Sequence, residues 1–166
     1  MLRNCLFLIC LPLFISLQLN AQRCWMSEDH PMPSSSAAAK QLMESDLKEA
    51  LQRLEANPKQ LDALIWAGRR TAYLGNYYQS LDFFSRAIEL HPGAAAPYRH
   101  RGHRYITLRC FDKAINDFER AVALTTGLPD EVEPDGMPNE QNIPTSTLQS
   151  NIWYHLGLAH YLKGDF

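Results

Sequence analysis

The chain has 166 residues, and 16 Lys and Arg against 18 Asp and Glu give it a formal net charge of −2. This length fits one folded domain. The balanced charge gives no reason to expect a nucleic acid or an acidic membrane as partner. None of the four cysteines has zinc-type spacing, and the two that would remain after the loss of Cys5 and Cys10 are too few for a disulfide framework.

Residues 1–21 have the pattern of a secretory signal peptide. Arg3 precedes an apolar run from Cys5 to Leu17, which is shorter than the roughly 20 residues of a membrane-spanning helix. Ala21 then offers a small residue for cleavage. We therefore expect export to a periplasmic or extracellular location, with cleavage near Ala21 and no membrane contact in the mature form. An uncleaved membrane anchor is the alternative.

Residues 22–36 contain two prolines and three consecutive serines, which is typical of a flexible tail or linker. Cleavage would leave two cysteines, Cys24 and Cys110. Export would permit a bridge between them. Because Cys24 lies in the tail, we expect no native disulfide.

Residues 37–58 predict an N-terminal capping helix. The segment is rich in helix formers, and its apolar residues recur at steps of three and four: Leu47, Ala50, Leu51 and Leu54. Pro58 ends the helix because its ring disfavours helical geometry at the preceding residue.

A repeat with an offset of 34 residues follows. The segment from Leu61 to Pro92 superposes on the segment from Ala95 to Thr126, and the unit restarts at Ser150. The shared positions are a glycine (Gly68, Gly102, Gly157), an aromatic residue (Tyr77, Phe111), a phenylalanine (Phe84, Phe118) and an alanine (Ala87, Ala121). This period and these residues resemble the tetratricopeptide repeat (TPR), a helix hairpin of 34 residues.

The resemblance implies an all-α fold, a right-handed superhelical array of antiparallel helix hairpins. Residues 61–126 would form two repeats, with turns near Gly75-Asn76 and Arg109-Cys110. A Pro-rich loop insertion with five acids and no base would occupy residues 127–149. The shared glycine is expected where the second helix of a unit approaches the first closely.

Residues 150–166 match only the first helix of a third repeat, so we expect the chain to be truncated within that repeat. Trp153, Leu156 and Gly157 would then lack a covering helix. Exposed apolar surface of this kind favours association, and we expect this segment to fray or to self-associate.

The second repeat departs from the family at Arg101, which occupies a position that is usually leucine. We expect its stem to pack while its head reaches the surface or an acid. On that basis Arg101→Leu would be neutral or stabilising.

In this family the first helix of each unit lines the concave face, which usually holds the ligand. The resemblance implies that the binding residues come from three helices: Arg69 and Tyr73; Arg99, His103 and Ile106; and Tyr154, Leu158 and Tyr161. Guanidinium groups suit carboxylate or phosphate, and tyrosines add rigid apolar area. Alternatively, the arginines only solvate a helix face. The lysine–asparagine–arginine pattern of chaperone-binding members is absent.

No catalytic residue, metal or cofactor is expected. Four histidines lie on corresponding helices (His100, His103, His155, His160), but we expect equivalent positions on stacked helices to be too far apart to share an ion. The loop from Glu131 to Gly136 resembles a calcium loop but lacks its closing glutamate. Phosphate-loop, dinucleotide and nucleophile-elbow motifs are absent, so we expect no enzyme.

The sequence therefore predicts a protein- or peptide-binding scaffold in the cell envelope. Two alternatives stay open, namely a regulatory or assembly module of a longer, possibly catalytic chain and a sensor of acidic small molecules. Residues 61–126 carry nine Lys and Arg against six Asp and Glu. The acids of the insertion could therefore lie against the arginines of the second unit (Arg99, Arg101, Arg104, Arg109).

Overall fold

The computed structural model describes residues 36–133 and 138–165, so the expected signal peptide and nearly all of the expected tail lie outside the described residues. The described residues form six helices and no strand: α1 (Ala37–Ala56), α2 (Leu61–Tyr73), α3 (Tyr77–Leu90), α4 (Ala95–Thr107), α5 (Phe111–Thr125) and α6 (Leu148–Lys163). The expected all-α fold is confirmed. No helix in this part of the chain is long and apolar enough to cross a bilayer.

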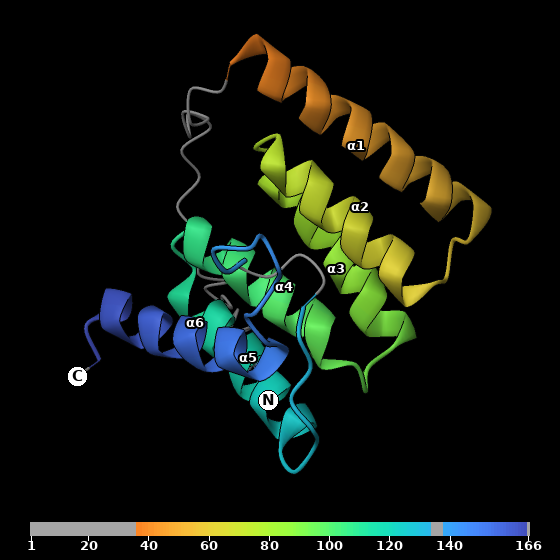
Figure 1. Ribbon diagram of the computed structural model, residues 1–166. Coiled ribbons are helices and arrows are strands. Elements are labelled where there is room, and N and C mark those ends of the chain that lie inside the picture. Colours follow the sequence, from red (N-terminus) through yellow and green to blue (C-terminus); the bar gives the residue numbers. More distant parts are fainter. Residues whose placement is uncertain (1–35, 134–137, 166) are drawn as a thin grey trace, which may run out of the picture.

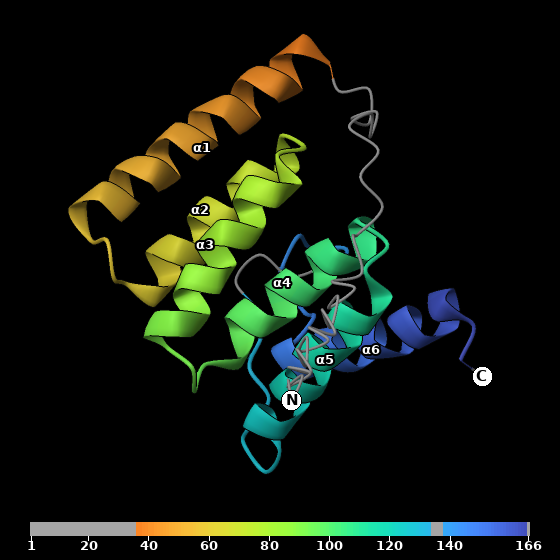
Figure 2. The same cartoon turned by 180° about the vertical axis from the view of Figure 1, so that it is seen from behind.

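The helices stack in chain order. Each one packs against the next, and α4 also contacts α2 and α6. Figure 1 and, from behind, Figure 2 show α1 against α2 at one end of the array and α6 at the other. Helices α2 and α3 form one hairpin and α4 and α5 the next, as the offset of 34 residues predicts.

Local signals set the ends of these helices. The Ser36 side chain accepts a hydrogen bond from the backbone N–H of Ala39 at 3.1 Å and so caps α1. Gly75, in the turn between α2 and α3, has a φ of 82°, which glycine adopts without strain. The corresponding turn after α4 uses Arg109, with a φ of 56°. Helix α6 begins with a capping box at Thr147 and ends at the left-handed Gly164.

The shared glycines lie against the central phenylalanines in two of the three units. A Cβ atom on Gly68 would lie 2.6 Å from Phe84, and one on Gly102 would lie 2.9 Å from Phe118. Both rings are fully buried. The expected close approach is therefore present in both units. At Gly157 an added Cβ would meet nothing within 4 Å, so close approach does not explain this third glycine.

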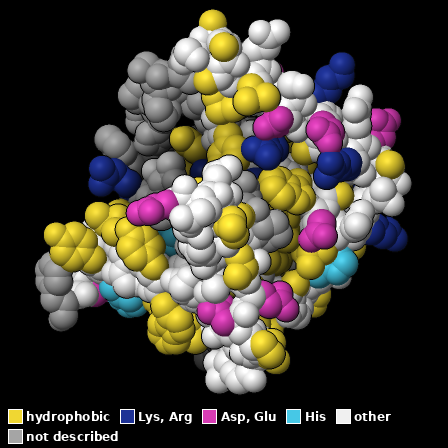
Figure 3. All heavy atoms as spheres, viewed as in Figure 1, with side chains coloured by type: hydrophobic (Ala, Val, Ile, Leu, Met, Phe, Trp, Pro, Cys, Tyr) yellow, Lys and Arg dark blue, Asp and Glu magenta, His cyan; other side chains and the backbone are white. Residues whose placement is uncertain are grey.

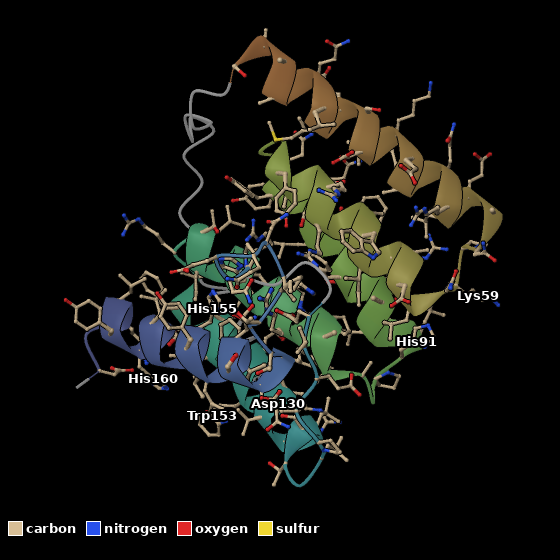
Figure 4. The ribbon with its side chains drawn as sticks, viewed as in Figure 1. Lys59, His91, Asp130, Trp153, His155 and His160 are labelled. Atoms are coloured by element: carbon tan, nitrogen blue, oxygen red, sulfur yellow. The ribbon has the colours of Figure 1, made fainter. Side chains whose placement is uncertain are left out.

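Helix α6 exposes apolar side chains, although not all of those expected. Trp153 is 58% exposed and points away from the other helices (Figure 4). Leu156, expected to be uncovered, instead packs partly buried against the core cluster of α5 that contains Phe118. In Figure 3 hydrophobic side chains gather at the surface over α6, at the left of the view. Tyr154, Tyr161 and Leu162 are also exposed.

Arg101 is held by an acid more firmly than the sequence suggested. Its Nε and Nη2 atoms each donate to the Asp117 carboxylate at 2.8 Å, and Nη1 donates to the Ser85 hydroxyl at 3.0 Å. Asp117 is only 6% exposed. The head of Arg101 therefore reaches an acid, as expected, but we now expect Arg101→Leu to be destabilising, because leucine would leave a buried carboxylate without its partner.

Cys110, just before α5, is disulfide-bonded. This corrects the expectation that it has no bridge. The other three cysteines of the chain lie outside the described residues. Cys110 is itself buried.

Candidate functional site

The first helices of the three units share one side of the array, which we call the α2–α4–α6 face. Four of the eight predicted binding residues, Arg69, Tyr73, Arg99 and His103, come together there and line a pocket of about 170 Å³. Arg104 and His100 complete its polar lining. We call this cavity the arginine pocket.

The other four predicted residues do not line the arginine pocket. Ile106 packs partly buried against the core cluster of α5, so its role is packing between helices. Tyr154 is 67% exposed, and its ring meets His155 edge to face at 5.0 Å. Tyr161 is 65% exposed and Leu158 is half-buried. The third unit therefore offers its tyrosines on the surface of α6.

Among the described residues, three arginines and no carboxylate line the arginine pocket. Burial, and to a smaller degree repulsion from Arg69, lowers the pKa of Arg104. Burial, with repulsion from Arg69 and Arg104, lowers the pKa of Arg99 as well, although Glu133 opposes the shift. The Nη2 atom of Arg104 contacts Nδ1 of His103 at 2.9 Å. Within the described part of the chain, no carboxylate pairs with Arg104. Such a cluster favours an anionic group with several acceptor atoms.

One carboxylate does reach this face, and it comes from the insertion. Arg99 Nη2 donates to Glu133 Oε2 at 2.8 Å, and the Asn151 side-chain amide on α6 donates to the same oxygen. His100 Nε2 lies 3.9 Å from the other carboxylate oxygen. The expectation that insertion acids lie against these arginines thus holds for Arg99, whereas Arg101 is paired with Asp117.

Glu133 is also part of a second, larger cavity. This space of about 360 Å³ lies between α2, α4 and the insertion, and we call it the insertion pocket. Arg69 and His100 line both cavities. Trp66 and Ile65 give the insertion pocket an apolar side, while Asp62 and Glu131 are its other acids.

Three histidines of this face, His100, His103 and His155, are called the face histidines here. His100 stacks on Phe84 at 5.6 Å, and His155 stacks on Phe118 at 5.9 Å. Burial, and then the nearby arginines, lower the pKa values of His100 and His155 below 6.5, and burial lowers that of His103 to about 2. All three are therefore neutral at pH 7 and add no positive charge to the pocket.

Two histidine rings of neighbouring units lie close together. His103 and His155, which occupy different repeat positions, have ring centroids 4.4 Å apart, while the expected separation of equivalent positions stays a prediction. Within residues 36–133 and 138–165, however, no group of three His, Cys, Asp or Glu could hold a metal. The calcium-like loop lies partly outside the described residues.

Sequence reasoning missed Glu133, His100 and His155 as members of the site. Glu133 could not be singled out because the insertion has five acids and no repeat position to guide the choice. A signal did exist for the histidines. Residues 100 and 155 are separated by the same step as Gly102 and Gly157, which makes them equivalent positions that stack on equivalent phenylalanines.

Helix hairpins at a 34-residue offset, with a glycine of one helix packed on a phenylalanine of the other, define a tetratricopeptide-repeat-like fold. Solved structures agree. The crystal structure of MamA superposes with a TM-score of 0.55 at 18% identity, covering 80% of this chain and 68% of MamA. YrrB, described as a TPR protein with an unusual peptide-binding site, superposes with a TM-score of 0.51 at 20% identity, covering 70% of this chain and 49% of YrrB.

Similarity to known sequences is short. No family model matches the chain. Over 49 residues, 30% of the chain, it is 39% identical to serine/threonine-protein phosphatase 5 from Mus musculus, and it covers 10% of that protein. These comparisons establish the fold.

Proposed function

We propose that this chain is a non-enzymatic scaffold that binds a segment of another protein on the α2–α4–α6 face. The observation that carries the proposal is the arginine pocket, where three arginines and a tyrosine from two repeat units converge on one cavity. Rigid helices position these side chains, which favours a preformed binding site. The fold supports the proposal, since one structural neighbour, YrrB, is described as having a peptide-binding site.

The geometry favours a peptide over a compact small molecule. The arginine pocket alone holds about 170 Å³, below the 300–1,000 Å³ that is usual for drug-sized ligands. The insertion pocket shares two lining residues with it, and exposed Tyr154 and Tyr161 extend the surface along α6. An extended chain with an acidic side chain at the arginine pocket would use all three parts.

The test compares two arginines that differ in location. Arg104 lines the pocket, whereas Arg120 is an exposed residue of α5. Fluorescence anisotropy with libraries of acidic, neutral and basic 12-residue peptides is expected to show binding by the wild type and by Arg120→Ala. Arg104→Ala is expected to lose about tenfold or more in affinity, as removal of a charge-assisted hydrogen bond would cause. Equal affinities for the two variants would contradict the proposed site.

We also propose that the chain acts in the cell envelope after removal of residues 1–21. Support comes from the apolar run between Cys5 and Leu17 and the small residue Ala21. Mass spectrometry of the chain recovered from a cell that produces it is expected to give an N-terminus at Gln22. Recovery of the chain with residues 1–21 attached would favour a membrane anchor.

A further inference from the structure

The insertion between α5 and α6 contacts the rest of the protein in an unusual way. Of the residues 127–133 and 138–147 that the structure describes, Glu133 is the only buried one. The large apolar residues of the same segment, Leu128, Val132 and Ile143, are each more than half exposed. The buried anchor of the insertion is therefore a carboxylate, where loops that pack stably on a protein normally bury apolar groups.

The carboxylate of Glu133 is bound as a ligand would be. It receives a charge-assisted hydrogen bond from Arg99 on α4 and a hydrogen bond from Asn151 on α6. Two repeat units therefore bind the same carboxylate. Arg99 is itself only 8% exposed, and its Nε has no hydrogen-bond partner. The site thus retains a buried donor that Glu133 does not satisfy.

Hydrogen bonds at the base of the insertion also hold the anchor in place. The backbone N–H of Glu133 donates to the carbonyl of Ser146 at 3.1 Å, and that of Leu148 donates to the carbonyl of Glu131 at 2.8 Å. Asp130 accepts from the hydroxyl of Thr147 and from the backbone of Gln149, at the start of α6 (Figure 4). Those bonds fix the base of the insertion next to α6. Segments with few buried apolar contacts open at low free-energy cost.

We infer that Glu133 is an internal competitor: it occupies the carboxylate position of the α2–α4–α6 face and is displaced when an acidic peptide of the partner binds. This inference rests on the proposed function and names the chemistry of its ligand. Displacement exchanges one carboxylate for another, so Arg99 has a counter-charge both before and after the exchange. The adjacent Arg104, which no described carboxylate neutralises, gives an external peptide with a second acid an advantage over Glu133.

The probe is a fluorescein-labelled peptide with the sequence of residues 130–136, Asp-Glu-Val-Glu-Pro-Asp-Gly. A neutral counterpart carries Asn and Gln in place of the acids. Against the whole chain, Glu133→Ala is expected to bind the acidic peptide about tenfold more tightly than wild type, since a site that is open one-tenth of the time loses that factor in apparent affinity. The matched control is Glu140→Ala, which removes the same charge from an exposed acid of the insertion that lines neither pocket and is expected to change affinity less than about twofold.

A second measurement needs no substitution. Hydrogen exchange of the wild-type amides of Glu133 and Leu148 is expected to speed up when the acidic peptide is added, and to stay unchanged with the neutral one. The inference is overturned if Glu133→Ala and Glu140→Ala bind the acidic peptide equally, or if the amides of Glu133 and Leu148 do not respond. If Arg104→Ala still loses affinity in that case, the proposed function stands and only the competitor role of Glu133 fails. Failure of every variant to bind either peptide would overturn both.

Discussion

The glycine shared by the three units allows a stability test with an internal control. Gly68→Ala would place a Cβ atom 2.6 Å from Cε1 and 2.8 Å from Cζ of Phe84. The ring cannot yield easily, because it is 1% exposed and stacked on His100. Overpacking costs about 1–3 kcal/mol, and replacing a mid-helix glycine by alanine returns about 1 kcal/mol. We expect a net loss of up to about 2 kcal/mol.

The other two glycines should respond in a graded way. At Gly102 only one contact with Phe118, at 2.9 Å, is shorter than 3.0 Å, so the loss should be smaller than at Gly68. At Gly157 nothing lies within 4 Å of the added atom. Gly157→Ala is therefore expected to stabilise the protein by about 0.5–1 kcal/mol through helix propensity alone.

Urea denaturation of the three alanine variants, followed by circular dichroism, measures these differences. The m-value reports whether the unfolding transition remains comparable between variants. The packing argument is refuted if all three variants change stability by the same amount and in the same direction. The glycine would then recur in the repeat because of its backbone and not because of its contact with a phenylalanine. Leucine at Gly68 should cost more than alanine, because it adds further atoms against the same ring.

Three further predictions follow from the described contacts. Arg101→Leu is expected to cost about 2–4 kcal/mol in urea denaturation, and Arg101→Leu/Asp117→Leu to recover much of it, since the pair is then removed together; a neutral single variant would contradict this. The face histidines have folded pKa values below 6.5, so their unfolded forms bind more protons below that pH. The contribution of the neutral histidines to the free energy of unfolding is fully present above pH 6.5. It is lost as pH falls, by up to about 1.4 kcal/mol per pH unit for each histidine. A melting temperature that does not fall between pH 7 and pH 5 would refute this prediction. A consensus second helix appended after residue 166 should cover Trp153 and lower the binding of a dye specific for apolar surface, and unchanged dye binding would show that this face needs no cover.

The repeat period allowed much of the fold to be predicted. Side chains at an offset of 34 residues, such as Phe84 and Phe118, fall into equivalent environments, so helix pairing follows from spacing alone. The same reasoning placed Arg69, Tyr73, Arg99 and His103 on one face, and the structure brings these four together. Position within a repeat, however, does not fix how deeply a side chain is buried. Ile106 was therefore predicted at the surface, whereas it packs partly buried against the core.

Contacts between segments that follow no period could only come from the tertiary structure. Whether Arg101 is neutralised by Asp117 or reaches solvent depends on the distance between α4 and α5, which no local pattern encodes. The same holds for Glu133, because the insertion lies outside the repeat and the path of a loop is decided by the partners that it finds. The sequence by itself determined the helical array and the face that carries the arginines. Only the folded chain decided that one of its own acids occupies that face, since an ion pair between distant segments forms only when packing brings its two charges within reach.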